Sequence, residues 1–442
     1  MKYVIIGGVA AGMSAAMEIY RKDEQAQITV FEKGEYYSYG QCGLPYVISG
    51  VVDSFDDLIA RSLQTFREKY KIDARIDTIV ESVNFNEQTV SVKSKETNNE
   101  FEVEYDKLLI ASGASSIYPE WAGSQLSGIH RLGTIPDANE LLKDLDEDIN
   151  NVTIIGGGYI GLEAAENIFE LGKKVTLIQR GDQVANIFDA DMAEIIHNKA
   201  EEKGINLILN EEVTGFIGDH YVEKVQTNKN LYKTEVVLLG IGVQPNTEFL
   251  THTDIHLNDN GAVIVNAYQE TNIKNVYAAG DCATDYHRVK QINDYIPLGT
   301  TANKQGRIAG ANMANDSLTF KGIVGTSIIK FFDITLGKTG ITEKEAKSLS
   351  IPYKVQKTDA NSHAGYYPGN EKLTIKILYH EETNELLGGQ IIGAEGVDKR
   401  VDVLATALYN KMSMSDLIDL DLAYAPPYNS AWDPIQQMAR KS

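Results

Sequence analysis

The residue best suited to covalent chemistry is Cys42, in the segment Ser38–Tyr46 (SYGQCGLPY). Thiolate is the nucleophilic form of cysteine, and a thiol with an ordinary pKa of about 8.5 is only ~3% ionised at pH 7. A helix that begins near Gly43–Pro45 would direct its N-terminus at the sulfur and favour the thiolate. Glycines on both sides of Gln41-Cys42 indicate an accessible thiol. We therefore predict that Cys42 is a redox nucleophile.

The other cysteine, Cys282, lies among small residues in the run AAGDCA. This setting is typical of a packed, inert thiol. Two cysteines exclude a disulfide framework, and their spacing gives no metal-ligand pattern, so we expect no metal. Low cysteine usage favours a reducing, cytoplasmic location.

Two similar glycine turns lie far apart in the chain. Val4–Ala16 (VIIGGVAAGMSAA) is followed by Thr153–Ala165 (TIIGGGYIGLEAA), and each is a β-branched run, a glycine turn and an alanine-rich helix. A second strand follows each helix. Strand, glycine turn, helix and strand form the βαβ unit that binds a dinucleotide pyrophosphate at a helix N-terminus. Two copies predict two bound dinucleotides.

The residue that ends each second strand bears on which dinucleotide is bound. In the first copy this residue is Glu32, whose carboxylate can accept protons from both ribose hydroxyls, although Val9 replaces the middle glycine of the turn. In the second copy the glycine pattern is complete, and the corresponding residue is Gln179, followed by Arg180. A carboxylate repels a 2′-phosphate, whereas an amide and a guanidinium accept it, which favours NADPH over NADH.

Composition restricts the partners. The 442 residues carry 41 Lys and Arg against 62 Asp and Glu, a net charge of -21 that disfavours nucleic acid. No apolar run reaches the ~18 residues of a membrane span, so we expect no membrane partner. The first twenty residues resemble a signal peptide in composition, but glycines interrupt their apolar run and favour a strand, turn and helix.

The order of these patterns predicts an α/β protein with two Rossmann-like dinucleotide-binding domains, one interrupted by the other, and a C-terminal α+β domain. The predicted divisions are 1–116 with 247–321 for the first domain, 117–246 for the second and 322–442 for the third. In the third we expect two strands around a polar turn at Glu381–Asn384 and a helix over Val401–Lys411.

Several segments resemble the flavoprotein disulfide reductases that bind two dinucleotides. These segments are the two glycine turns, Tyr105–Ala114 (YDKLLIASGA), Gly240–Asn246 (GIGVQPN) and Val276–Ala283 (VYAAGDCA). A single redox cysteine is similar to the branch that contains coenzyme A-disulfide reductases, NADH oxidases and NADH peroxidases. His363–Gly369 (HAGYYPG) and Ala423–Tyr428 (AYAPPY) resemble the coenzyme A-disulfide reductases, and Ala10 stands where the oxidases and peroxidases have histidine.

The resemblance implies a set of cofactor-binding residues. FAD would lie on the first domain and NADPH, with NADH as the alternative, on the second, and the C-terminal α+β domain would be a dimerisation domain. For FAD the implied residues are Gly7, Gly8, Ala11, Gly12, Glu32, Lys33, Ser112, Gly113 and Asp281. For the nicotinamide nucleotide they are Gly156, Gly158, Tyr159, Ile160, Gly161, Glu163, Gln179 and Arg180.

The resemblance also implies the reaction and a homodimer. Cys42 would attack coenzyme A (CoA) disulfide and release one CoA thiol, and reduction through FAD would free the second. Tyr366 and Tyr424 match catalytic tyrosines that relatives contribute from the partner subunit. CoA persulfide or polysulfide as substrate, an NADH oxidase and a low-turnover redox sensor remain alternatives. The implied substrate-binding residues are Ser14, Arg21, Lys22, Ser38, Gln41 and Asn303.

Overall fold

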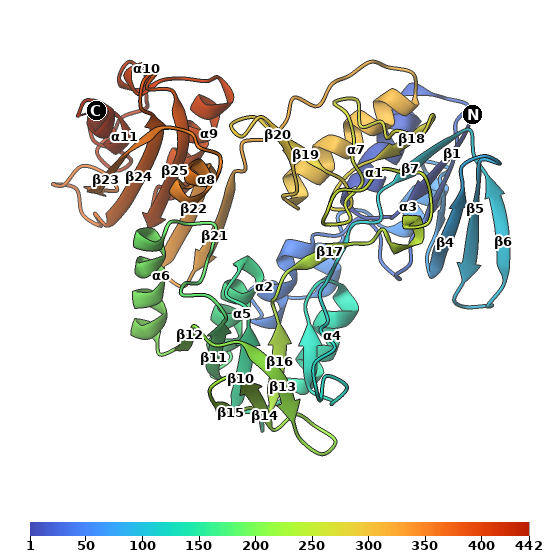
Figure 1. The fold of residues 1–442 in the computed structure, drawn as a ribbon, viewed down its shortest axis with the longest axis horizontal. Coiled ribbons are helices and arrows are strands. Elements are labelled where there is room, and N and C mark those ends of the chain that lie inside the picture. Colours follow the sequence, from blue (N-terminus) through green and yellow to red (C-terminus); the bar gives the residue numbers. More distant parts are fainter. Residues whose placement is uncertain (442) are drawn as a thin grey trace.

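The computed structural model describes residues 1–441, which form three parts (Figure 1). The first contains the N-terminus, the second contains the green helix α5, and the third is the orange and red C-terminal part. No helix in the described chain is both long and apolar enough to cross a membrane.

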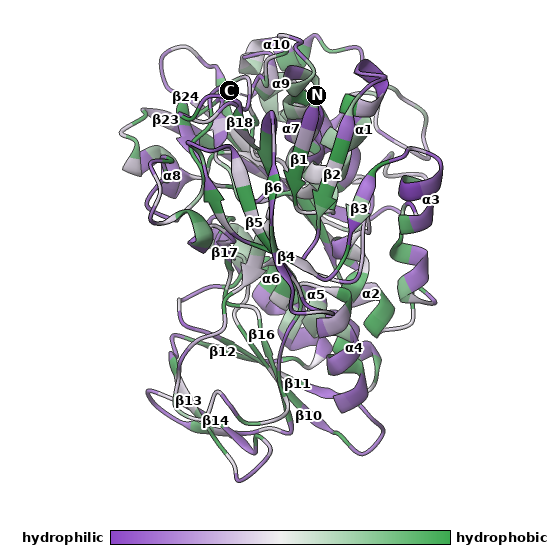
Figure 2. Ribbon diagram, turned by 90° about the vertical axis from the view of Figure 1, so that its right-hand side faces the viewer, coloured by the Kyte–Doolittle hydropathy of each residue, from purple (hydrophilic) through white to green (hydrophobic). Residues whose placement is uncertain are grey.

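The first part is built on a five-stranded parallel sheet. Its order is β18 (Val276–Ala278), β7 (Lys107–Ile110), β1 (Lys2–Ile6), β2 (Gln27–Phe31) and β3 (Asp73–Arg75). Helix α1 (Ala10–Lys22) crosses from β1 to β2, and α7 (Gly299–Met313) packs on α1. Strand β1 is hydrophobic and buried because both faces of the sheet are covered, as the colouring of Figure 2 shows.

The two faces of this sheet have different covers. Tyr3 and Ile5 pack towards α1 and α7, whereas Val4 and Ile6 pack towards a three-stranded antiparallel sheet. That sheet consists of β4 (Thr78–Asn84), β5 (Thr89–Ser94) and β6 (Glu100–Glu104). Shorter elements complete this part: α2 (Leu44–Ile48), α3 (Leu63–Glu68), β19 (Asp285–His287) and β20 (Ile292–Asp294).

Helices α1 and α7 approach each other at backbone contact. A Cβ atom added at Gly306 would lie 2.2 Å from the carbonyl oxygen of Ala11, and one at Gly310 would lie 2.5 Å from that of Ala15. Only glycine fits at these two positions of α7. The close packing fixes where α7 begins relative to the first glycine turn.

The second part repeats the arrangement. Its parallel sheet has the order β12 (Asn206–Leu209), β11 (Lys174–Gln179), β10 (Asn151–Ile155), β16 (Val236–Leu239) and β9 (Ile129–Arg131). Its helices are α4 (Ile135–Asp144), α5 (Tyr159–Glu170) and α6 (Ala190–Lys203). A small antiparallel sheet adds β13 (Val213–Ile217), β14 (Lys224–Thr227) and β15 (Leu231–Lys233).

The first sheet takes its strands from both sides of the second in the sequence. Residues 2–110 and 276–278 contribute to the first sheet, and residues 129–239 form the second. The predicted interruption of one domain by the other is therefore confirmed. The chain crosses between them at the paired strands β8 (Ala114–Ser116) and β17 (Val243–Pro245), and the boundaries at 116/117, 246/247 and 321/322 stay predictions.

The third part is a five-stranded antiparallel sheet covered by α9 (Val397–Tyr409). Its order is β21 (Ser327–Phe331), β22 (Ile334–Gly340), β25 (Leu386–Gly393), β24 (Lys372–His380) and β23 (Tyr353–Asn361). Short helices α8 (Glu343–Ser348), α10 (Met414–Ile418) and α11 (Pro434–Ala439) lie around it.

Two local expectations for the third part can be compared with these elements. The polar turn at Glu381–Asn384 lies between β24 and β25 as expected, with Asn384 in the left-handed region (φ +57°). The helix expected over Val401–Lys411 begins four residues earlier and ends at Tyr409, so those limits were wrong. Gly396, at φ +81°, sets its true beginning, a feature that hydrophobic spacing does not reveal.

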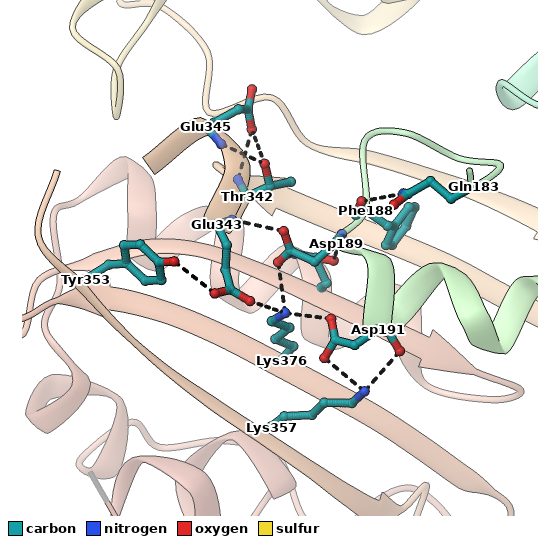
Figure 3. Close-up of polar contacts among 11 residues, drawn as sticks. Gln183, Phe188, Asp189, Asp191, Thr342, Glu343, Glu345, Tyr353, Lys357 and Lys376 are labelled. Carbon is teal, nitrogen blue, oxygen red and sulfur yellow. Dashed lines mark hydrogen bonds and ion pairs between the residues drawn. The ribbon is translucent and has the colours of Figure 1, made fainter. Parts of the chain in front are cut away.

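An ionic cluster around the buried side chains of Lys376 and Asp189 joins the second and third parts (Figure 3). The Lys376 ammonium lies 3.1 Å from Asp189, 2.6 Å from Asp191 and 2.6 Å from Glu343. The two aspartates lie at the start of α6, whereas Lys376 is on β24 and Glu343 begins α8. Lys376 therefore supplies one cation that three carboxylates share at this junction.

Candidate active site

The first glycine turn leaves helix α1 with an open N-terminus. Gly7 has φ +109°, and a Cβ atom there would lie 2.0 Å from the Ala111 carbonyl oxygen. At Gly12 a Cβ atom would lie 1.9 Å from the Gly7 carbonyl oxygen. No side chain caps α1, whose N-cap residue is Val9. The first backbone N–H groups of α1 are therefore available to an anion such as a pyrophosphate.

Glu32 lies where the sequence predicts a ribose ligand. It is buried at the end of β2, and its two oxygens accept hydrogen bonds from Gly8 N–H and Gly34 N–H, both at 2.8 Å. Each oxygen of a carboxylate has two lone pairs, so this fixed carboxylate retains acceptor capacity for a ribose hydroxyl.

The second glycine turn repeats this geometry. Gly156 has φ +100°, Gly161 packs against the Gly156 carbonyl oxygen, and Gly158 faces open space with no atom within 4 Å of an added Cβ. Gln179 accepts a hydrogen bond of 2.9 Å from Gly157 N–H. Helix α5 also has no side-chain cap. The open space at Gly158 and the uncapped helix fit the close approach of a dinucleotide pyrophosphate.

Arg180 follows Gln179 at the end of β11. Its side chain is 81% exposed, and its closest ion-pair partner, Glu212, is 3.9 Å away. The guanidinium is therefore free to approach a phosphate from the solvent side.

The other residues predicted to bind cofactors surround the two turns. Ala11 lies in the first turn of α1 under α7, and Ile160 is half-buried at the start of α5. Ser112 donates a 2.7 Å hydrogen bond to the Asn246 carbonyl, so its hydroxyl joins the two crossing segments. Gly113 faces open space with φ +68°. Lys33 donates to Ser115 Oγ at 3.3 Å.

Cys42 is exposed and lies in a short 3-10 turn, Gln41–Gly43, that continues directly into α2. The expected accessibility agrees with this position, but the expected effect on the thiol does not. Although the residue is exposed, nearby protein atoms desolvate its thiol, and this desolvation, followed by the charges of Glu163 and Asp281, raises the pKa of Cys42. The backbone N–H at the start of this helical segment lowers the pKa of the thiol, as expected, but desolvation and two carboxylates outweigh it.

Cys282 is fully buried, and its Sγ donates to the Ile110 carbonyl at 3.4 Å. This position agrees with the expected inert thiol. The two cysteines therefore have different environments, and only Cys42 is accessible to a substrate.

The predicted substrate-binding residues form two groups. Ser14 on α1 donates a 2.8 Å hydrogen bond to Asn303 Oδ1 on α7. Ser38 and Gln41 lie instead in the Cys42 segment, where the Ser38 N–H bonds to the Gly8 carbonyl at 3.0 Å. Gln41 donates to the Gly133 carbonyl at 3.0 Å. The structure therefore joins the Cys42 segment to the first glycine turn.

The two basic residues at the end of α1 have acidic neighbours. Arg21 pairs with Glu18 at 3.0 Å, and Lys22 pairs with Asp316 at 2.5 Å. Arg21 remains 59% exposed, whereas the Lys22 side chain is 31% exposed. An anionic ligand at this end of α1 would meet Arg21 more readily than Lys22.

Tyr366 and Tyr424 meet on the third part. Their hydroxyls are 3.3 Å apart, and the residues are 76% and 51% exposed. Within the described chain no hydrogen bond or ring contact links either tyrosine to the Cys42 segment. The structure of one chain thus brings the tyrosines together but does not bring them to Cys42.

Sequence reasoning missed the residue that connects the two tyrosine segments. Arg400 of α9 is buried and donates to the Ser362 carbonyl at 2.9 Å, to Asn429 Oδ1 at 3.1 Å and to Asp433 at 3.0 Å. Ser362 precedes the Tyr366 segment, and Asn429 follows the Tyr424 segment. An arginine on an amphipathic helix carries no sequence signal for such a role.

The polar environment of Asp281 was also missed. Tyr295 donates to the Asp281 carbonyl at 2.9 Å, and burial raises the pKa of the Asp281 carboxyl group. Gln305 of α7 accepts from Gly280 N–H at 2.7 Å and donates to Asp285 at 2.8 Å. These contacts fix the Asp281 loop against α7, and only the tertiary fold brings them together.

The chain matches two models of one protein family. Residues 1–306 match the pyridine nucleotide-disulphide oxidoreductase model, and residues 326–434 match the dimerisation domain of the same family. The chain belongs to the pyridine nucleotide-disulphide oxidoreductase family. This membership confirms the predicted fold class, and it confirms FAD and a nicotinamide nucleotide as the cofactor types of an oxidoreductase.

Individual relatives are similar over their whole length. The NAD(P)H coenzyme A polysulfide/persulfide reductase of Pyrococcus horikoshii is 37% identical over 99% of this chain and 98% of its own. The coenzyme A disulfide reductase of Staphylococcus aureus is 33% identical over 100% of this chain and 99% of its own.

Solved structures give the same fold. Reduced Bacillus anthracis CoADR-RHD superimposes with a TM-score of 0.96 at 35% identity, covering 100% of this chain and 79% of its own. The water-forming NADH oxidase of Lactobacillus brevis also gives 0.96, at 27% identity, covering 100% and 98%. The fold alone therefore does not separate a thiol reductase from an oxidase.

Proposed function

We propose that this protein is a homodimeric reductase that uses NADPH, FAD and Cys42 to reduce CoA disulfide to two CoA thiols. The observation that carries the proposal is the contrast between an exposed Cys42 and a fully buried Cys282. The chain has no third cysteine, and Cys282 is fully buried, so Cys42 has no accessible partner for an internal redox disulfide. In a disulfide exchange the second sulfur then comes from the substrate.

The proposed reduction has two steps, in which every sulfur–sulfur bond and electron is accounted for. The Cys42 thiolate attacks one sulfur of the CoA disulfide, a Cys42–S–S–CoA bond forms, the CoA–S–S–CoA bond breaks, and one CoA thiolate leaves. Two electrons then cleave the mixed disulfide and regenerate the Cys42 thiolate with the second CoA thiolate. Bound FAD supplies these electrons from the nicotinamide nucleotide.

The protein residues bind and orient the reactants. The uncapped N-termini of α1 and α5 bind the two pyrophosphates, and Glu32 binds a ribose. Arg21 and the Ser14–Asn303 pair form the proposed contact for the nucleotide portion of CoA. Gln179 and Arg180 accommodate the 2′-phosphate of NADPH.

The dimer completes the site. Tyr366 and Tyr424 are exposed and do not reach Cys42 within one chain, and residues 326–434 match a dimerisation domain. A partner subunit can present both hydroxyls to the sulfur chemistry, where a phenol donates a hydrogen bond to a departing thiolate.

A second substrate is supported by the relatives. The Pyrococcus horikoshii protein is named for polysulfide and persulfide reduction, and attack on a CoA persulfide uses the same Cys42. An NADH oxidase would cycle Cys42 through a sulfenic acid instead. Steady-state rates with CoA disulfide, CoA persulfide and oxygen, each with NADPH and NADH, separate these functions.

The deciding experiment pairs these rates with substitutions at both cysteines. Cys42→Ser is expected to lower CoA disulfide reduction at least ~100-fold while flavin remains bound, because a hydroxyl cannot form the mixed disulfide. Cys282→Ser keeps a small donor to the Ile110 carbonyl and serves as the matched control. Rapid reoxidation of the reduced enzyme by oxygen, with no response to CoA disulfide or persulfide, would refute the proposed reductase.

A further inference from the structure

Helices α2 and α5 meet next to Cys42 through two side-chain contacts. The Tyr46 hydroxyl donates to Glu163 Oε1 at 3.3 Å, and one turn further along, the Ser49 hydroxyl donates to Asn167 Oδ1 at 2.5 Å. Figure 1 shows that α2, although it belongs to the first part of the chain, lies beside α5 of the second part. The redox segment of the first part is thereby attached to the nucleotide-binding helix of the second.

Tyr46 lies four residues after Cys42 in a continuous helical segment. Side chains separated by four residues lie on the same face of a helix. The electrostatic interactions agree with this placement, because the negative charge of Glu163 raises the pKa of Cys42 and also that of Tyr46. Tyr46 thus contacts the carboxylate on α5 and lies close enough to the Cys42 thiol for their charges to interact.

Glu163 has no cation to balance its charge. Its neighbour on the same helix, Glu166, forms an ion pair with Lys330 of β21, whereas Glu163 has only the Tyr46 phenol. No lysine, arginine or histidine lies within ion-pair distance of Glu163 among residues 1–441. Burial is the main cause that raises the pKa of Glu163, to about 7, and the Tyr46 hydrogen bond lowers it.

The groups that surround this pair come from four elements. They are Cys42 in the turn before α2, Asp281 in the loop after β18, Tyr159 and Glu166 on α5, and Ser327 and Lys330 on β21. Tyr159 bonds to Ser327, so its hydroxyl is directed towards β21. None of these six residues is hydrogen-bonded to the Glu163 carboxyl group, whose partner is the Tyr46 hydroxyl.

We propose that Glu163 and Tyr46 form a positioning pair that holds or releases a proton and thereby controls how readily the Cys42 thiol ionises. The inference deepens the proposed function, on which it rests, because the thiolate of Cys42 is the attacking group. Neither residue touches the sulfur chemistry directly. Ionised Glu163 places a negative charge beside the thiol and opposes the thiolate, whereas protonated Glu163 removes that opposition.

The sign of the effect can be followed with pH. As the pH rises through neutrality, Glu163 loses its proton, and its new charge makes the thiol harder to ionise. Two groups coupled in this way titrate together rather than as independent acids. The ionisation of Cys42 should therefore be broader than that of a single thiol.

The test measures the rate at which iodoacetamide alkylates Cys42 in the purified flavin-bound protein. Peptide mass spectrometry separates Cys42 from buried Cys282, and the profile runs from about pH 5 to about pH 10. Glu163→Gln keeps a hydrogen-bond acceptor for Tyr46 but removes the charge. It should alkylate roughly three- to tenfold faster near pH 8 and give a profile with a single step.

Two further variants separate charge from helix packing. Tyr46→Phe removes the hydrogen bond that favours ionised Glu163. The step at lower pH in the alkylation profile, which reports the ionisation of Glu163, should therefore move to higher pH. Ser49→Ala is the matched control, because it removes the neighbouring contact between α2 and α5 without changing any charge. Its profile should superimpose on that of the unaltered protein.

Two results would overturn the inference. Either the Glu163→Gln and Tyr46→Phe profiles match that of the unaltered protein, or Ser49→Ala shifts the profile as much as Glu163→Gln does. Alkylation needs no substrate, so the outcome is independent of the proposed reaction. Failure of the unaltered protein to reduce CoA disulfide or persulfide would refute the proposed function and leave the alkylation result standing.

Discussion

The side-chain oxygen of Gln179 accepts a hydrogen bond of 2.9 Å from the backbone N–H of Gly157. Glu32 makes the same contact with Gly8 in the first glycine turn, at 2.8 Å. The two turns thus use the same geometry with a different chemical group, an amide in one and a carboxylate in the other. The amide leaves a neutral donor, rather than a negative charge, beside the ribose position.

This equivalence predicts the result of Gln179→Glu. The contact with Gly157 should survive, because Glu32 shows that a carboxylate can make it, but the new charge would repel a 2′-phosphate. We expect kcat/KM for NADPH to fall roughly tenfold or more relative to NADH. Arg180→Ala should act in the same direction. An unchanged ratio of the two nucleotides in both variants would contradict the assignment of these residues.

Gly158 and Gly161 offer a matched pair in the second turn. An added Cβ at Gly158 meets no atom within 4 Å, whereas one at Gly161 would lie 1.9 Å from the Gly156 carbonyl oxygen. Gly158→Ala should therefore retain its melting temperature and bind the nicotinamide nucleotide more weakly. Gly161→Ala should lose stability by about 1–3 kcal/mol, because the clash involves backbone. Thermal unfolding and nucleotide titration distinguish the two effects.

The exposed Tyr366–Tyr424 pair predicts complementation between subunits. Cys42→Ser and the double variant Tyr366→Phe, Tyr424→Phe should each be poorly active alone. In a mixed dimer, one site combines an intact Cys42 with the intact tyrosine pair of the other chain, so activity should return there. Co-expression with two affinity tags and measurement of the doubly tagged species test this.

A matched substitution and a negative result complete that experiment. Tyr367→Phe alters a neighbouring tyrosine whose ring contacts His363, and it should leave the rate near that of the unaltered protein. If the mixed dimer is no more active than its parents, the tyrosines do not act across the interface.

The Lys376 cluster predicts a large loss of stability on Lys376→Met. This substitution leaves Asp189, Asp191 and Glu343 without their shared cation, and loss of the cation from its buried pair with Asp189 costs about 3–5 kcal/mol. Lys357→Met removes a partly exposed partner of Asp191 and should cost at most about 1 kcal/mol. Chemical denaturation of both variants provides the comparison.

The same cluster has a defined response to acid. Hydrogen bonds and charge from Lys376 and its neighbours lower the pKa of Asp191 and Glu343 in spite of burial. Carboxyl groups with lowered pKa stabilise the fold above their unfolded pKa, near 4, and lose that contribution as the pH falls through the folded pKa. The free energy of unfolding should drop below about pH 4, and less steeply in Lys376→Met.

The local patterns of the sequence were enough for the architecture, and they nominated the residues of the proposed site. The glycine turns at Gly7–Gly12 and Gly156–Gly161 predicted two βαβ units, because only glycine fits where a carbonyl oxygen lies about 2 Å from an added Cβ. The small residues around Cys282 indicated a buried thiol, and glycines beside Cys42 indicated an accessible one. Each of these features depends on residues close together in the chain.

Contacts between distant residues lay beyond such patterns. The raised pKa of Cys42 depends on Glu163 and Asp281, which are more than a hundred residues away in sequence, and Arg400 connects loops that no motif relates. Electrostatic and desolvation effects act through space, and spacing along the chain does not encode those distances. The sequence by itself determined the fold class and the two glycine turns, and it singled out Cys42 as the proposed redox nucleophile. Only the tertiary structure decided the environment in which that cysteine ionises.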